Sequence, residues 1–98
     1  MSEIIITDVQ IIPVYPKDGL VSFASCIFNE QFYFGCLAIH TSPSSPEGYR
    51  LVYPAKLLPN GKRANIYHPL TQEAGQVVQS AVISKYKDLL YKLRVDEE

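Results

Sequence analysis

The sequence predicts an α+β fold: a small twisted antiparallel β-sheet with a protruding hairpin and one long C-terminal α-helix packed on it. Residues 4–41 are rich in Ile, Val, Phe and Tyr, which favour strands, and turn-forming residues interrupt them. An Asn-Gly pair between two X-Pro dipeptides marks a hairpin in residues 53–69. From Thr71 onward, apolar residues recur at three- and four-residue steps, which is typical of a helix that packs one face on a sheet.

Three strands are expected in the first 41 residues. Pro13 lies within the first of them, and because proline cannot donate a hydrogen bond to the ladder, it indicates an edge strand or a bulge. The turn cluster 16–19 ends the first strand, and polar residues 29–31 join the other two. The expected strands are Ile4–Tyr15, Leu20–Phe28 and Phe32–Thr41.

The second and third strands are apolar on both alternating sets of residues. A sheet with one solvated face would alternate more cleanly, so both faces are expected to be covered. Only one long helix is available, and we therefore expect a second copy of the chain to cover the other face or an edge, which makes a homodimer. The alternative is that residues 41–54 fold back over the sheet.

The two cysteines, Cys26 and Cys36, lie in adjacent expected strands. A two-residue turn at Glu30-Gln31 would place the sulfurs on opposite faces, whereas a three-residue turn would place them opposite each other. We expect buried free thiols. No second Cys or His stands at metal-ligand spacing, so no metal site is expected.

Residues 53–69, YPAKLLPNGKRANIYHP, are expected to form a bounded hairpin arm. Asn60-Gly61 tolerates the positive φ angles of a tight turn, and such a turn would expose Lys62 and Arg63 at its tip. Proline removes an amide donor and pushes the preceding residue toward extended geometry, so Tyr53-Pro54 and His68-Pro69 bracket the arm.

The helix is expected from about Thr71 to Val95. Thr71 is a suitable N-cap, and Gly75 weakens the first turns by up to about 1 kcal/mol relative to alanine. Residues 1–95 are expected to form one domain, followed by a frayed acidic tail, 96–98. The apolar stripe expected to pack on the sheet comprises Val78, Ala81, Val82, Tyr86, Leu89, Leu90 and Leu93.

The order of these features resembles the stage V sporulation protein G (SpoVG, septation regulator) family. Its members carry Pro-Ser-Lys, then Pro-Asp-Gly, then Ile, any residue and His-Pro just before a C-terminal helix. The likeness also includes Ile6–Val9, Ser80–Val82 and Tyr86, and covers the chain from about Ile6 to Leu90. The matching hairpin residues are Pro54-Ala55-Lys56, Pro59-Asn60-Gly61 and Ile66-Tyr67-His68-Pro69.

This resemblance implies a small α+β protein, usually dimeric, that binds DNA or RNA and acts as a regulator in bacteria. Family members often place Arg directly after the Lys and a second Arg shortly before His-Pro. This chain has Leu57 and Ala64 at those places. Lys62 and Arg63 stand nearby, but strand neighbours point to opposite faces, so a shift of one residue redirects a charge.

The charge is distributed unevenly along the 98 residues. The net charge is −1, yet residues 1–48 hold one basic and five acidic residues, whereas residues 49–95 hold eight basic and two acidic ones. An anionic partner would therefore be attracted to the second half. The candidate nucleic-acid-binding residues are Lys56, Lys62, Arg63, Lys85 and Lys87; in addition, Tyr53 or Tyr67 either stacks on unpaired bases or packs on the sheet.

The sequence thus favours a SpoVG-like homodimeric regulator that binds nucleic acid through the hairpin and helix. The alternative is a dimeric protein-interaction module whose basic residues are incidental. No nucleophile elbow, phosphate loop or dinucleotide motif is present, so no enzyme activity, cofactor or small-molecule substrate is expected. No apolar run spans a bilayer and no basic region precedes an apolar one at the N-terminus, so we expect a cytoplasmic protein without a membrane partner.

Overall fold

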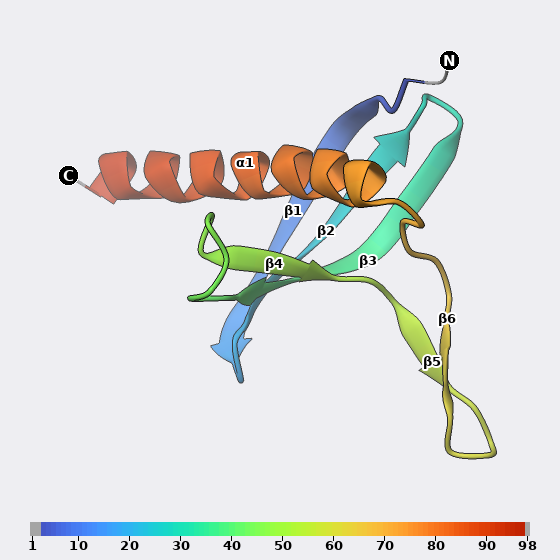
Figure 1. Cartoon of the computed structure of the whole chain (residues 1–98). Helices are drawn as coiled ribbons and strands as arrows, with labels where there is room; N and C mark the ends of the chain where they lie inside the picture. Colours follow the sequence, from blue (N-terminus) through green and yellow to red (C-terminus); the bar gives the residue numbers. More distant parts are fainter. Residues whose placement is uncertain (1–2, 98) are drawn as a thin grey trace.

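A four-stranded antiparallel sheet with one long helix across it forms the body, and a two-stranded hairpin protrudes from it (Figure 1). The computed structural model describes residues 3–97 of the chain, and the side chains of residues 3–93. The predicted α+β fold is confirmed. The first sheet, in the order β1-β2-β3-β4, consists of β1 (Ile6–Lys17), β2 (Leu20–Phe28), β3 (Phe32–Thr41) and β4 (Tyr49–Val52); the hairpin consists of β5 (Ala55–Leu57) and β6 (Arg63–Asn65), and α1 spans Gln72–Glu97.

The predicted bounds of β2 and β3 are confirmed, but β1 begins later and runs through Pro16 to Lys17. The turn is consequently confined to Asp18 and Gly19, which both have positive φ angles. β1 pairs only with β2 and thus forms one edge of the sheet, and its register shifts after Pro13. The edge position predicted from Pro13 is correct.

A three-residue turn, 29–31, joins β2 to β3, because Phe28 pairs with Phe32. The turn has the three-residue length, but it does not place the two sulfurs opposite each other, because Cys26 pairs with Phe34. A register shift between Ala24 and Cys26 forms a bulge that contains Cys36, whose φ is 57°. Both thiols are free, as expected. Cys26 is buried, but the expected burial of Cys36 is wrong, because this bulge leaves its side chain exposed.

The core lies between α1 and one face of the sheet. The predicted helix stripe is correct for Val78, Val82 and Tyr86, which are buried, and wrong for Leu90 and Leu93, which are 39% and 51% exposed. The prediction also omitted Ile83, which is fully buried. The C-terminal turns of α1 extend past the sheet, so the sheet covers the side chains there less than those of the first turns (Figure 1). The core residues are Ala24, Cys26, Leu37, Ile39, Val78, Val82, Ile83 and Tyr86.

The backbone of α1 continues to Glu97, so two residues of the expected acidic tail are helical, and Glu98 lies outside the described residues. At the other end Thr71 caps the helix as predicted. Its Oγ1 accepts a hydrogen bond from the Ala74 amide at 3.0 Å, and its carbonyl accepts one from the Gly75 amide at 3.1 Å.

Gly75→Ala is expected to raise the free energy of unfolding by about 0.5–1 kcal/mol, because alanine loses less backbone entropy in a helix. The new Cβ would meet only Pro69 Cγ at 3.6 Å, an ordinary contact. Urea denaturation of both proteins measures the difference. An unchanged or lower stability would mean that the first turn of α1 needs the glycine.

The segment after β3 extends the sheet instead of covering it. β4 pairs with β3 from Tyr49 to Val52, and the loop before it lies on the helix side, where Gln79 Nε2 donates to Glu47 Oε1 and to the Tyr49 carbonyl, both at 3.3 Å. The alternative in which residues 41–54 fold over the free face is therefore wrong. Across that face the register aligns Ile12, Phe23, Ala38 and Val52, one from each strand.

Candidate nucleic-acid interface

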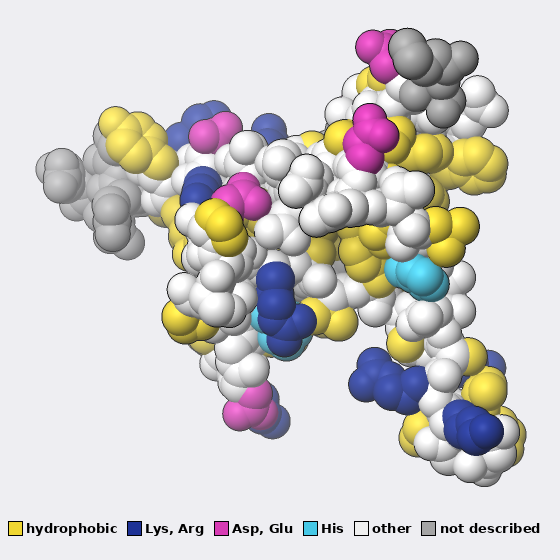
Figure 2. All heavy atoms as spheres, in the orientation of Figure 1, with side chains coloured by type: hydrophobic (Ala, Val, Ile, Leu, Met, Phe, Trp, Pro, Cys, Tyr) yellow, Lys and Arg dark blue, Asp and Glu magenta, His cyan; other side chains and the backbone are white. Residues whose placement is uncertain are grey.

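The predicted hairpin arm is present and carries its cations at the outer end (Figure 2). Its turn spans five residues, 58–62, and of the Asn-Gly pair only Gly61 has a positive φ, 83°. The Gly61 amide donates to the Leu58 carbonyl at 2.9 Å, and the Lys62 amide donates to Asn60 Oδ1 at 3.0 Å. The turn is thus longer than a tight Asn-Gly turn, but Lys62 and Arg63 are exposed as predicted.

The register of the arm divides its cations between two faces. Lys56 lies opposite Ala64, and Leu57 lies opposite Arg63. Directly opposed residues share a face and neighbours along a strand do not, so Lys56 and Arg63 point to opposite sides. Lys62 belongs to the turn. The arm therefore presents one strand cation on each face, with a third at its tip.

The two helix lysines lie away from the arm and away from each other. Lys85 borders a groove between α1 and β1 together with Asp8 and Asp88, whereas Lys87 lies beside Tyr49 and Tyr91. In Figure 2 the basic side chains over α1 and those of the arm lie at opposite ends of the molecule. Of the five candidate residues, the single chain brings together only the three on the arm.

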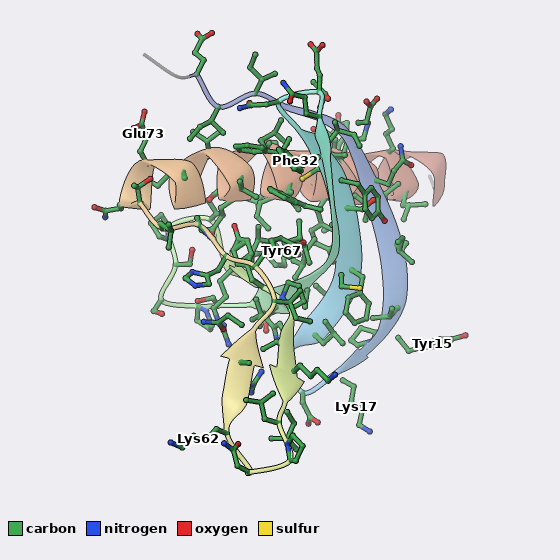
Figure 3. The ribbon with its side chains drawn as sticks, turned by 90° about the vertical axis from the view of Figure 1, so that its right-hand side faces the viewer. Tyr15, Lys17, Phe32, Lys62, Tyr67 and Glu73 are labelled. Atoms are coloured by element: carbon green, nitrogen blue, oxygen red, sulfur yellow. The ribbon has the colours of Figure 1, made fainter. Side chains whose placement is uncertain are left out.

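An aromatic cluster joins the arm to the body (Figure 3). The Tyr67 ring stacks on Phe34, with centroids 4.7 Å apart, and meets Tyr53 edge-on at 6.0 Å. The Tyr67 hydroxyl donates to the Gly35 carbonyl, and Phe34 stacks on Phe28 at 5.2 Å. Both tyrosines named from the sequence therefore pack against the sheet.

A small apolar cavity opens beside these rings, with a volume of about 150 Å³. Sequence reasoning missed this feature because its walls come from β2, β3, both ends of the arm and α1. Three exposed apolar side chains occur in the same segments: Phe32 at 60%, Ile66 at 62% and Leu70 at 89% exposure. The cavity is lined by Phe28, Phe34, Tyr53, Tyr67, His68, Pro69 and Val78.

Burial raises the pKa of both tyrosines in the cluster. It raises the pKa of Tyr53 to about 12, and the nearby Cys26 thiol adds to the effect. Burial raises the pKa of Tyr67 as well, again with a contribution from Cys26. Neither hydroxyl ionises near neutral pH, so the cluster offers rings and hydrogen-bonding hydroxyls and no negative charge.

Tyr67→Phe is expected to lower stability at pH 8 by about 1 kcal/mol, because the Gly35 carbonyl loses its donor. The raised pKa means that the native state holds the Tyr67 proton more tightly than the unfolded chain does. This contribution is full below the ordinary tyrosine pKa of 10.0 and is lost as pH rises above it. The difference in free energy of unfolding between the unaltered protein and Tyr67→Phe, measured by urea denaturation, should therefore be smaller at pH 11 than at pH 8. An equal difference at both pH values would contradict the role of the Tyr67 hydroxyl as a donor.

Among the described side chains, those of residues 3–93, no group of three or more His, Cys, Asp or Glu is arranged to hold a metal ion. The described part of α1 is also not apolar enough over any 18-residue window to cross a membrane.

The sheet, the helix across one of its faces and the protruding basic hairpin define a class of small α+β protein with an exposed arm. The chain belongs to the SpoVG family, whose model matches residues 4–88. It is similar to proteins named "Putative septation protein SpoVG" from three bacteria. The one from Caldicellulosiruptor bescii is 28% identical over 87 residues, 87% of this chain and 93% of the relative. Those from Treponema denticola and Phytoplasma australiense are 29% and 27% identical, cover 84% and 87% of this chain, and each match over 85% of their own length.

Proposed function

We propose that this protein is a homodimeric regulatory protein that binds DNA or RNA through its basic arm. The observation that carries the proposal is the arm itself, which holds Lys56, Lys62 and Arg63 away from the body. Lysine and arginine neutralise phosphates and release counterions, and such contacts need no shaped pocket. Lys85 and Lys87 add attraction from the helix. This role uses no chemical step, so the proposal includes no enzyme activity.

The proposed dimer buries the free face of the sheet. Ile12 is 53% exposed, and Phe23, Ala38 and Val52 continue the same row across the other strands. A contiguous apolar row on one face is unusual for a surface that stays in water. Multi-angle light scattering at micromolar concentration should give twice the chain mass of 11.0 kDa, and Ile12→Glu should give the single mass. A monomeric unaltered protein would refute the dimer.

The salt dependence of binding tests the proposed function. Two arms in a dimer offer six cations, so the logarithm of affinity for duplex DNA should fall against the logarithm of salt concentration with a slope of about −5. Fluorescence anisotropy with labelled duplex DNA and single-stranded RNA, at salt concentrations between about 25 and about 200 mM, measures this slope. Absence of binding to either at low salt would refute the proposal and favour the dimeric protein-interaction module.

Ala64→Arg and Leu57→Arg determine which face of the arm meets the ligand. The arginine introduced by Ala64→Arg would join Lys56 on one face, and the arginine introduced by Leu57→Arg would join Arg63 on the other. For each arm engaged, the variant on the contacting face is expected to bind about eightfold more tightly at 0.1 M salt, with a duplex slope steeper by about 0.9. The other variant is expected to change little. Equal gains from both would show that charge alone matters and that neither face is preferred.

A further inference from the structure

The cavity at the base of the arm lies where a strand held by the arm would pass. Tyr53 immediately precedes the chain that enters β5, and Tyr67 and His68 closely follow β6, so both ends of the arm lead into the cavity wall. From Arg63 to Tyr67 the extended chain spans about 13 Å, which corresponds to about four phosphate steps of a stacked strand. The cations and the cavity are therefore within reach of one short oligonucleotide.

The walls of the cavity suit a flat aromatic ring. Four of the seven lining side chains are aromatic, and Phe28, Phe34 and Tyr67 are stacked in a row. A cavity of about 150 Å³ with apolar walls is large enough for a benzene ring. Exposed His68 lies at its edge, where it provides a ring nitrogen for the polar edge of a base.

We propose that this cavity accepts one unpaired pyrimidine base of a strand whose phosphates lie along the arm, so that the protein prefers single strands to duplexes. The inference rests on the proposed function and names its substrate class. Stacking on aromatic side chains tolerates different sequences and contributes substantially to each bound base. A paired base cannot enter without leaving the duplex, at a cost in stacking and pairing.

The test uses the full chain and three labelled ligands of equal length: oligothymidylate, its duplex with oligoadenylate, and an abasic strand with the same phosphates. Oligothymidylate is expected to bind about tenfold more tightly than the abasic strand. Equal affinity for the two would overturn the inference and leave the arm as the proposed site. Failure of all three to bind, together with failure of single-stranded RNA to bind at low salt, would overturn the proposed function as well.

A protein variant provides the second part of the test. Val78→Phe places a ring into the cavity without altering a charge, and Val77→Phe, on the same helix but outside the lining, is its matched control. Val78→Phe is expected to bind oligothymidylate and the abasic strand with equal affinity. Val77→Phe is expected to keep the preference for oligothymidylate. If Val78→Phe keeps the preference too, the cavity is not the base site. The abasic comparison holds even if Val78→Phe fails to fold.

Discussion

Ile83→Ala is expected to lower the free energy of unfolding by about 2–5 kcal/mol, which is a large part of the roughly 5–15 kcal/mol typical of a folded domain. Ile83 is fully buried between α1 and the sheet, in contact with a core that includes Leu37 and Ile39. Truncation removes buried methyl groups and leaves a cavity that the close-packed core fills only partly. Urea denaturation followed by circular dichroism measures the loss.

Leu93→Ala is the matched control, because it truncates an apolar side chain on the same helix where that side chain is 51% exposed. In a single chain its effect should stay within about 0.5 kcal/mol. A cost comparable with that of Ile83→Ala would show that the end of α1 is covered in the folded protein.

The elements that sequence reasoning placed correctly are those set by local chemistry. β2 and β3 follow from apolar and aromatic runs bounded by polar turns, and Thr71 caps α1 through its own hydroxyl. The predicted burial is wrong for Leu90 and Leu93, and the buried Ile83 is missing from the prediction. A periodic stripe gives no information about where the sheet under it ends. Helical spacing predicts a face, and burial depends on the tertiary partner of that face.

The same contrast applies to the site. Lys62 and Arg63 could be placed at an exposed tip because a proline, an asparagine and a glycine precede them in a turn. The division of Lys56 and Arg63 between two faces depends on the register of β5 with β6, which a five-residue turn sets in place of a two-residue one. The aromatic cavity draws on residues 28–78, and no local spacing connects them.

Replacing Lys62 and Arg63 together with alanine is expected to weaken binding to duplex DNA about 60-fold at 0.1 M salt for each arm engaged. Each lost phosphate contact removes about 0.9 from the slope of log affinity against log salt, so the pair should flatten the slope by about 1.8 for each arm engaged. Both side chains are exposed on a protruding hairpin, so the fold and its melting temperature should be unchanged. Anisotropy titrations at four salt concentrations determine affinity and slope together.

Two variants with the same loss of charge separate position from net charge. Lys17→Ala with Lys92→Ala removes two cations far from the arm, at the β1–β2 turn and near the C-terminal end of α1, and should change affinity by less than about threefold, because exposed charges beyond a Debye length are screened. Lys85→Ala with Lys87→Ala measures how much the helix lysines contribute to the affinity and to its salt dependence. If all three pairs weaken binding alike and flatten the slope alike, the arm has no special role. A loss confined to Lys62 and Arg63 would assign the phosphate contacts to the arm.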